Sequence, residues 1–295
     1  MDFHLLDPEQ HARFDEQGYL IIRGALSPQQ CTALDQAAQC LIDSPQVHDR
    51  ARMSATYDGF RNVLASGGEP FERLLTNGST VSLAAQLLSR NLQLHTSQLI
   101  FKYPEATGAD PQALSPGWHR DIHTIPSDLG DAGNNRFEVK IAYYLSAASG
   151  RASGVTLVAR GSNTWTTAPR FDAAGDPPAV VVPDLSPGDA LLFENRTWHA
   201  AAVNTSSVVR RCVIYGYSYR WIRPDDWTEQ SPELLARLSP IARDLLTPMH
   251  WKDKEGRFDL NSNIPALHAW FERHGAMGAA QAASERRLLG AGAGA

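Results

Sequence analysis

The 295-residue chain lacks the features that mark several classes of protein. It has no apolar run long enough for a membrane-spanning helix, and its first residues form neither the basic region nor the apolar segment of a secretory signal. Basic residues are not concentrated in a stripe, and 27 Lys and Arg residues against 32 Asp and Glu residues give a net charge of −5. We therefore expect a cytoplasmic protein with neither a membrane nor a nucleic acid as a partner.

Cysteine is also scarce. The three cysteines, Cys31, Cys40 and Cys212, are odd in number and have no CxxC spacing. This excludes a disulfide framework and a zinc site made of thiolates. An apolar fraction of 43% with 20% charged residues is typical of a globular protein with a sizeable core. We find no internal repeat, and the sequence gives no indication of the oligomeric state.

The predicted secondary structure changes along the chain, and we expect four parts within a single domain, 1–295. These are a helical N-terminal part (1–90), a β core (91–222), C-terminal helices (223–289) and a flexible tail (290–295). In the first part, Asp7-Pro8 and Ser27-Pro28 are typical helix starts. Apolar spacing predicts helices at Pro28–Ile42, Val81–Leu88, Pro232–Leu246 and Ile264–His274, and a short strand at Tyr19–Arg23.

The central part contains six predicted strands, separated by Gly, Pro, Asn and Asp clusters and not by helices. This pattern favours an antiparallel sandwich or barrel. The strands are Leu92–Lys102, Phe137–Ser146, Gly154–Ala159, Ala179–Val182, Asp189–Phe193 and Val208–Tyr219.

A His-x-Asp motif follows a loop that contains proline and glycine. On an extended strand, residues i and i+2 point to one face, so His119 and Asp121 can offer an imidazole and a carboxylate to one metal ion. Such a pair is weak evidence in a chain with ten histidines. It becomes informative only with a third ligand on the same face.

His199 is that third candidate, at the end of a predicted strand that begins near Gly188. Two imidazoles and one carboxylate on one face leave three positions open, which suits iron(II) that must bind a chelating co-substrate and then O2. We therefore predict that His119, Asp121 and His199 bind iron. A zinc site in a hydrolase or isomerase is the alternative.

Arg210 lies eleven residues beyond His199 in the last predicted strand. A 2-oxoacid that chelates iron holds its second carboxylate some way from the metal, and a guanidinium can bind that group with two parallel hydrogen bonds. Neighbours on a strand face opposite sides, so either Arg210 or Arg211 faces inward. The residues alone do not decide between them.

These segments together resemble the phytanoyl-CoA dioxygenase family of iron(II)- and 2-oxoglutarate-dependent oxygenases. The resemblance implies a mainly β fold with flanking helices around a double-stranded β-helix core, also called a jelly-roll or cupin-like core. The matching segments are Phe14 to Gly24, Phe101 to Pro104, His119 to Asp121, Gly154 to Asn163, Pro187 to Phe193, His199, Asn204 and Arg210.

The resemblance also implies roles for single residues. The family's arginine eleven positions past the distal histidine binds 2-oxoglutarate, which favours Arg210, and an early lysine, here Lys102, supports the same ligand. The chain departs from the family at Asn163, where a histidine is usual, and at Ala200-Ala201, where a small polar pair commonly follows the distal histidine. The second departure removes a hydroxyl group that could bind the co-substrate, so another group must replace it.

Aromatic residues and a further histidine are candidates for the remaining contacts. We assign Tyr143 to the co-substrate site, and Trp118, His123 and Tyr217 to the substrate site, although large aromatic side chains more often pack in the core. His123 would lie two residues beyond Asp121 on the same strand face.

The sequence thus predicts an Fe(II)- and 2-oxoglutarate-dependent dioxygenase. We expect it to use O2 to hydroxylate a small molecule, such as a secondary metabolite or an amino-acid derivative, with release of succinate and CO2. The presence of Asp121 argues against halogenation, since halogenases of this type give up the carboxylate to make room for halide. Desaturation, cyclisation and epimerisation stay open. The rival hypotheses are a metal-dependent hydrolase or isomerase on the same barrel and a non-catalytic small-molecule binding protein.

Overall fold

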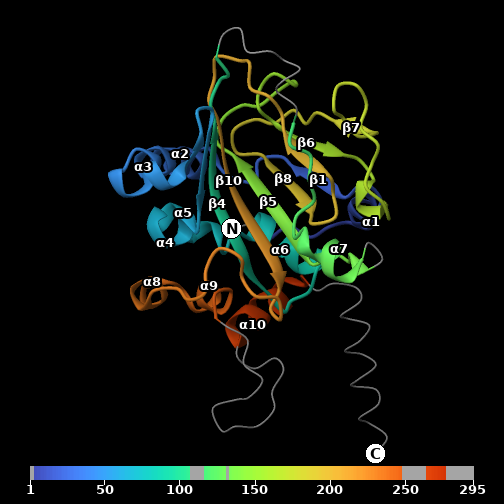
Figure 1. Cartoon of the computed structure of the whole chain (residues 1–295). Helices are drawn as coiled ribbons and strands as arrows, with labels where there is room; N and C mark the ends of the chain where they lie inside the picture. The colour runs from blue at the N-terminus through green and yellow to red at the C-terminus, as the bar shows by residue number, and fades with distance from the viewer. Residues whose placement is uncertain (1–2, 107–115, 131–132, 248–263, 277–295) are drawn as a thin grey trace, which may run out of the picture.

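The computed structural model describes residues 3–106, 116–130, 133–247 and 264–276. At its centre a seven-stranded antiparallel sheet, in the order β1-β8-β5-β10-β4-β3-β2, has helices on one side and a three-stranded sheet, β7-β6-β9, on the other (Figure 1). Two antiparallel sheets that face each other, with helices outside, confirm the predicted mainly β, jelly-roll core with flanking helices.

The elements have the following bounds. The strands are β1 (Tyr19–Ile22), β2 (Arg52–Ser54), β3 (Tyr57–Arg61), β4 (Leu92–Lys102), β5 (Glu138–Tyr144), β6 (Thr156–Ala159), β7 (Val180–Val181), β8 (Ala190–Glu194), β9 (His199–Ala201) and β10 (Arg210–Tyr219). The helices are α1 (Pro8–Gln17), α2 (Pro28–Ile42), α3 (Pro45–Ala51), α4 (Val63–Gly67), α5 (Glu69–Leu74), α6 (Gly78–Leu87), α7 (Thr124–Leu129), α8 (Pro232–Arg237), α9 (Pro240–Asp244), α10 (Pro265–His274) and the short 3-10 helix η2 (Ser162–Thr164).

The first two predicted helix starts are confirmed by their caps. The Asp7 carboxylate accepts a hydrogen bond from the Gln10 backbone N–H at 2.7 Å, and the Gln10 side chain accepts one from the Asp7 N–H at 3.1 Å. Ser27 and Gln30 form the same reciprocal pair before α2. In both helices a proline follows the cap, where its missing N–H removes no helical hydrogen bond.

The N- and C-terminal parts differ from the prediction. The predicted strand at Tyr19–Arg23 is confirmed as β1, which pairs with β8. Residues 1–90 also contain the unpredicted strands β2 and β3, and β3 pairs with β4 in the large sheet. The expected helix from Pro232 to Leu246 is two helices, since Pro240 lacks the N–H of a continuing helix and Ser239 caps a new one. Residues 277–295, including the predicted tail, lie outside the described residues. The single-domain organisation stays a prediction.

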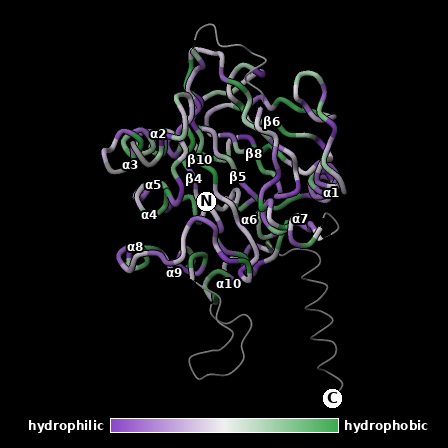
Figure 2. The backbone as a smooth tube through the Cα atoms, in the orientation of Figure 1, coloured by the Kyte–Doolittle hydropathy of each residue, from purple (hydrophilic) through white to green (hydrophobic). Residues whose placement is uncertain are grey.

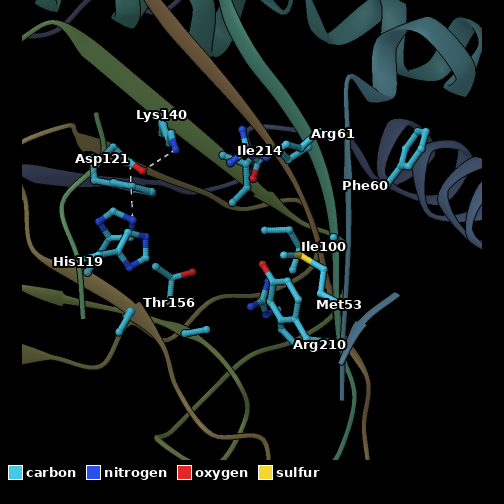
Figure 3. A pocket seen from close by; sticks show the side chains of 17 residues that line it. Met53, Phe60, Arg61, Ile100, His119, Asp121, Lys140, Thr156, Arg210 and Ile214 are labelled. Atoms are coloured by element: carbon cyan, nitrogen blue, oxygen red, sulfur yellow. Dashed lines mark hydrogen bonds and ion pairs between the residues drawn. The ribbon is translucent and has the colours of Figure 1, made fainter. Parts of the chain in front are cut away.

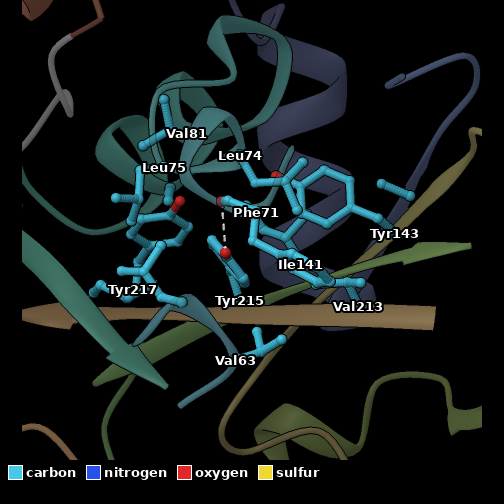
Figure 4. Packing of buried hydrophobic residues seen from close by; sticks show 14 of the residues in the cluster. Val63, Phe71, Leu74, Leu75, Val81, Ile141, Tyr143, Val213, Tyr215 and Tyr217 are labelled. Atoms are coloured by element: carbon cyan, nitrogen blue, oxygen red, sulfur yellow. Dashed lines mark hydrogen bonds between the residues drawn. The ribbon is translucent and has the colours of Figure 1, made fainter. Parts of the chain in front are cut away.

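The large sheet separates two apolar cores. Along β10, Val213, Tyr215 and Tyr217 pack with the helices (Figure 4), whereas Cys212 and Ile214 pack toward the small sheet. Side chains of a strand alternate between faces, so one strand serves both cores. Hydrophobic segments run along the central strands of the sheet (Figure 2). None of the helices within the described ranges has both the length and the apolar character needed to cross a membrane.

The buried histidine of α10 predicts a pH dependence of stability. His268 hydrogen-bonds through Nε2 to Asn91 Oδ1 at 2.8 Å, and burial, together with Arg90 and Arg220, lowers its pKa to about 4. The unfolded chain protonates this group near pH 6.5, so the free energy of unfolding falls as the pH falls from about 6.5 toward 4. At pH 5 the loss assigned to His268 is about 2 kcal/mol relative to pH 8.

Urea unfolding of the wild type and of His268→Gln at pH 8 and pH 5 measures this loss. We expect the variant to lose about 2 kcal/mol less than the wild type between the two pH values. An equal loss in both proteins would contradict the assignment, because other groups would then account for the pH dependence.

Candidate metal centre and its cavity

The backbone brings the two predicted histidine ligands together. His119 and His199 form an antiparallel bridge, with N–O distances of 3.0 Å in both directions, beside β9. Their ring centroids are 4.3 Å apart. Asp121 completes the cluster, and the ligand atoms of the three residues all lie within 4.8 Å of one another (Figure 3). The three side chains predicted as iron ligands thus converge on one point.

Hydrogen bonds fix the imidazoles in the form that binds a metal. The Nδ1 atom of His119 lies 2.7 Å from the Gly117 carbonyl oxygen, and that of His199 lies 2.9 Å from the Thr197 carbonyl oxygen. A carbonyl oxygen only accepts, so Nδ1 carries the proton in each ring and Nε2 keeps a free lone pair. Burial, moderated by Asp121, lowers the pKa of His199 to about 4, which keeps this imidazole neutral at pH 7.

Asp121 uses one oxygen for an ion pair and leaves the other free. Its Oδ1 accepts a hydrogen bond from Lys140 Nζ at 2.7 Å. Its Oδ2 is buried, has no hydrogen-bond partner among the described residues and lies 3.6 Å from His199 Nε2. Burial raises the pKa of Asp121, but the Lys140 ammonium outweighs this effect and holds the pKa below its usual range. An ionised, unpartnered oxygen beside two imidazole lone pairs fits a divalent metal ion.

The backbone between His119 and α7 is not the regular strand that we predicted. Only His119 takes part in a bridge, and Ile122 has a φ of 49°, a left-handed conformation that is rare for a β-branched residue. This turn directs the chain into α7, where His123 is the exposed residue before the first turn. His123 is not among the residues that line the cavity, and its assignment to the substrate site stays a prediction. The left-handed backbone of Ile122 implies strain on the order of 1–3 kcal/mol, and such strain is often found at functional sites.

A cavity of about 630 Å³ opens beside the three candidate ligands, between the large and small sheets. In Figure 3 His119, Asp121 and Lys140 lie at one end, and Met53, Ile100 and Arg210 at the other. The other residues that line the cavity are Tyr57, Gly59, Phe60, Arg61, Gln98, Thr156, Phe193, Ala200, Ala201 and Ile214.

Of the two neighbouring arginines, Arg210 faces the cavity. It is 2% exposed, and its Nε donates to the Gly154 carbonyl oxygen at 2.8 Å while one terminal nitrogen contacts Cys212 Sγ. It has no acidic partner within the described ranges. Arg211 points to the other side of β10, where Asp35 accepts two of its hydrogen bonds at 2.6 and 3.0 Å. The structure therefore places a buried, unneutralised guanidinium in the cavity wall.

The two tyrosines assigned to the site face away from it. Tyr143 and Tyr217 are fully buried in the core between the large sheet and the helices, and the Tyr143 hydroxyl lies 2.7 Å from Thr80 Oγ1. Alternation along β5 turns Tyr144 toward the small sheet and Tyr143 toward the helices. The co-substrate role of Tyr143 and the substrate role of Tyr217 are therefore corrected.

Lys102 and Trp118 lie near the cavity but do not line it. Lys102 donates to Glu105 at 2.7 Å, which satisfies its charge away from the candidate ligands. The Trp118 indole N–H donates to Asp176 Oδ1 at 3.1 Å. Neither residue is among those that line the cavity, and their assignments to the co-substrate and the substrate stay predictions.

Sequence reasoning did not assign five polar residues that do line the cavity, namely Tyr57, Arg61, Gln98, Lys140 and Thr156. The signal for Lys140 is that it is the single charged side chain in the otherwise apolar run from Val139 to Tyr144. Tyr57 lies on β3, a strand that the sequence did not reveal, and no signal in the sequence connects it with the site.

Comparison with solved structures shows the same fold elsewhere. EctD from S. alaskensis in its apoform superimposes with a TM-score of 0.58 and 20% identity, over 80% of this chain and 85% of that chain. SnoK, described as a non-heme alpha-ketoglutarate-dependent carbocyclase from nogalamycin biosynthesis, gives a TM-score of 0.57 and 20% identity, over 79% and 91%. At this identity the likeness shows the fold alone.

Sequence comparison gives two informative fungal relatives. Dioxygenase af480 of Aspergillus fumigatus is 29% identical over 182 residues, which are 60% of this chain and 54% of the relative. The chain therefore matches only about half of that protein. The multifunctional dioxygenase ausE of Aspergillus calidoustus is 26% identical over 235 residues, covering 72% of this chain and 74% of the relative. Finally, the sequence model of the family named phytanoyl-CoA dioxygenase matches residues 14–212, and the chain therefore belongs to the phytanoyl-CoA dioxygenase family.

Proposed function

We propose that the protein is an Fe(II)- and 2-oxoglutarate-dependent dioxygenase that hydroxylates a small organic molecule. The observation that carries the proposal is Arg210, a buried cation without an acidic partner in the described part of the chain, in the same cavity wall as an open set of three ligands. A buried charge is costly unless an anion pairs with it. The second carboxylate of 2-oxoglutarate would supply that anion.

The donor set supports iron(II) as the metal. His119 Nε2, His199 Nε2 and Asp121 Oδ2 would hold it, as a facial set of two imidazoles and one carboxylate with the remaining positions open. When bound, iron(II) supplies the activation of O2 that is coupled to oxidative decarboxylation of 2-oxoglutarate. Solved structures of EctD with 2-oxoglutarate and 5-hydroxyectoine, and of SnoN with Fe3+, alpha-ketoglutarate and nogalamycin RO, support the same pairing on a similar fold.

The residues around the ligands prepare and protect the site. Lys140 holds Asp121 Oδ1, so the carboxylate is set to offer Oδ2 alone and not both oxygens. Phe193 packs against the ring of His199, with centroids 4.5 Å apart, and restricts its movement. Ile100 and Ile214 give the wall between the sheets an apolar character, which limits the access of water to the reacting atoms.

The size of the cavity supports a small substrate beside 2-oxoglutarate, since its volume of about 630 Å³ lies within the range of small-molecule sites. The names of the relatives, dioxygenases of fungi, and of the structural neighbours from nogalamycin biosynthesis support a secondary metabolite. A hydrolase or isomerase on the same barrel would leave Arg210 without a partner or a role.

Anaerobic reconstitution tests the proposal. We expect the protein with iron(II) and 2-oxoglutarate to show a weak visible charge-transfer band, because a 2-oxoacid that binds iron through two oxygens produces one. Zinc(II) in place of iron(II) is the control and should give no band, since zinc(II) is not oxidised and has no d electron that it can transfer to the ligand. Absorption titration and the release of succinate in air are the measurements. Stoichiometric iron binding with neither the band nor measurable 2-oxoglutarate affinity would favour the hydrolase.

A further inference from the structure

A polar side chain without a partner lies in the cavity wall, away from the arginine proposed for 2-oxoglutarate. Gln98 of β4 lines the cavity, and its side-chain amide has no hydrogen-bond partner among the described residues. Its cross-strand neighbours are Arg61 of β3 and Ile214 of β10, which line the cavity too. Arg210 is four residues before Ile214 on the same strand, about 13 Å away. Gln98 can therefore contact a molecule bound beside the co-substrate.

Two carboxylates already neutralise Arg61, the charged neighbour of this amide. Its Nη1 donates to Asp225 Oδ2 at 2.8 Å and to Asp226 Oδ1 at 2.9 Å, and the Asp226 side chain is fully buried. The backbone N–H groups of Ser97 and Asn62 also donate to Asp226 and hold it in place. A guanidinium that contacts two carboxylates has no positive charge to spare, so this part of the cavity does not attract an anion.

The other cations of the cavity wall have partners as well. Lys140 is paired with Asp121, and Arg210 would be paired with the second carboxylate of 2-oxoglutarate. The described residues that line the cavity include no other lysine or arginine. A charged group buried without a counter-ion is costly, so the remaining space favours an uncharged molecule.

Apolar side chains surround the free amide. Met53 of β2 lines the cavity although it is 71% exposed, so it lies at the rim. A Cβ atom on Gly59 would lie 2.9 Å from Met53 Sδ, and the glycine therefore lets the thioether lie close to β3. Ile100 is the partner of Gly59 on β4, and Ile214 is the partner of Gln98 on β10. One amide among apolar groups suits a molecule with an apolar body and a single polar group.

We propose that Gln98 determines the class of substrate, by binding an uncharged amide or hydroxyl group of a largely apolar molecule, and that the cavity rejects anionic substrates. A glutamine side chain offers N–H donors and a carbonyl acceptor, and an amide or a hydroxyl group can use both kinds of contact. The inference rests on the proposed function, because 2-oxoglutarate must occupy Arg210 to leave no cation free.

Three probes that share one apolar ring test this class: cyclohexanecarboxamide, cyclohexylmethanol and cyclohexanecarboxylate. Ligand-observed NMR titration of the protein with 2-oxoglutarate and diamagnetic zinc(II) in place of iron(II) gives their dissociation constants without turnover. We expect the amide or the alcohol to bind at least about tenfold more tightly than the carboxylate, since an unpaired carboxylate is far costlier to bury than a neutral group.

Gln98→Met keeps the length of the side chain and removes its amide. It should weaken binding of the neutral probe about twofold to tenfold, the effect of losing one uncharged hydrogen bond. The affinity of the iron-loaded variant for 2-oxoglutarate should be unchanged, because Gln98 lies four residues along the sheet from the row of Arg210. This second measurement also shows that the variant is folded.

Removal of the two carboxylates tests the reason for the selectivity. Asp225→Asn combined with Asp226→Asn keeps the size and one acceptor oxygen of each side chain and frees the charge of Arg61. We expect the carboxylate probe to bind about tenfold more tightly to this double variant than to the wild type. Asp225→Asn alone, at an exposed residue, should show a smaller gain and replaces the double variant if circular dichroism shows that the latter does not fold.

The outcomes separate this inference from the proposed function. If the wild type binds iron(II) but not 2-oxoglutarate, the proposed function fails and the inference fails with it. If the wild type binds 2-oxoglutarate, three results overturn only the inference. These are a carboxylate probe that binds as tightly as the neutral probes or no probe that binds at all, a Gln98→Met variant with wild-type affinity for the neutral probe, and no gain for the carboxylate when Arg61 is freed.

Discussion

Arg210→Ala is expected to raise the dissociation constant of 2-oxoglutarate by about tenfold to a hundredfold, while the affinity for iron(II) changes little. The guanidinium is buried in the cavity wall and has no acidic partner in the described ranges, so the co-substrate would be its counter-ion. Loss of a hydrogen-bonded contact between charged groups costs about 1.5–3 kcal/mol, and each 1.4 kcal/mol is about one factor of ten. Anaerobic titration of the iron-loaded variant with 2-oxoglutarate measures the change.

Arg211→Ala is the matched control for this substitution. Its side chain is on the opposite face of β10 and pairs with Asp35, an ion pair that is partly exposed to solvent. Pairs of this kind contribute only about 0–1 kcal/mol, so we expect wild-type affinity for 2-oxoglutarate. A large loss in Arg211→Ala with little change in Arg210→Ala would mean that a different residue binds the co-substrate.

His199→Ala is expected to abolish stoichiometric iron binding and to reduce succinate release to background, with the fold retained. Substitution of residues that only support metal ligands typically costs tenfold to a hundredfold in affinity, so loss of a ligand should exceed about a hundredfold. Metal analysis and calorimetry on matched apo and reconstituted samples measure the loss. Circular dichroism shows whether the fold is retained.

Asp121→Ala should also lose iron, but its stability needs a separate control. The substitution leaves the buried Lys140 ammonium without its partner, which costs about 3–5 kcal/mol in typical buried pairs. Asp121→Ala combined with Lys140→Met removes both charges and should recover most of that stability while still failing to bind iron. Retention of stoichiometric iron in His199→Ala and in the double variant would show that the ligands are wrongly assigned.

The convergence of the three candidate ligands could be predicted because each of them lies in a short sequence motif that is recognisable by itself. His119 and Asp121 form one short motif, and His199 follows the strand that starts after the glycine turn. That strand, β8, ends at Glu194 and not at the histidine as predicted, and His199 is the first residue of β9. The position of Arg210 relative to Arg211 followed from the family spacing, and strand alternation then placed only one of them in the cavity. The bounds of β4 agree with the predicted strand at both ends.

The faces of the inner strands could not be predicted. β5 is buried on both sides, so apolar residues occupy both of its faces. Its sequence therefore lacks the alternation of apolar and polar residues that would show which side chains share a face. Tyr143 and Tyr144 are therefore equivalent in the sequence, although only Tyr144 faces the small sheet.

The hairpin of β2 and β3 makes one wall of the cavity from outside the catalytic core. Met53, Tyr57 and Arg61 come from this hairpin, which lies at the edge of the large sheet and joins it through the pairing of β3 with β4. The metal ligands and Arg210 belong to other elements. Substitutions at Met53, Tyr57 and Arg61 would therefore reshape this wall of the cavity without replacing a candidate metal ligand or Arg210, so the space for a substrate and the set of metal ligands can be altered separately.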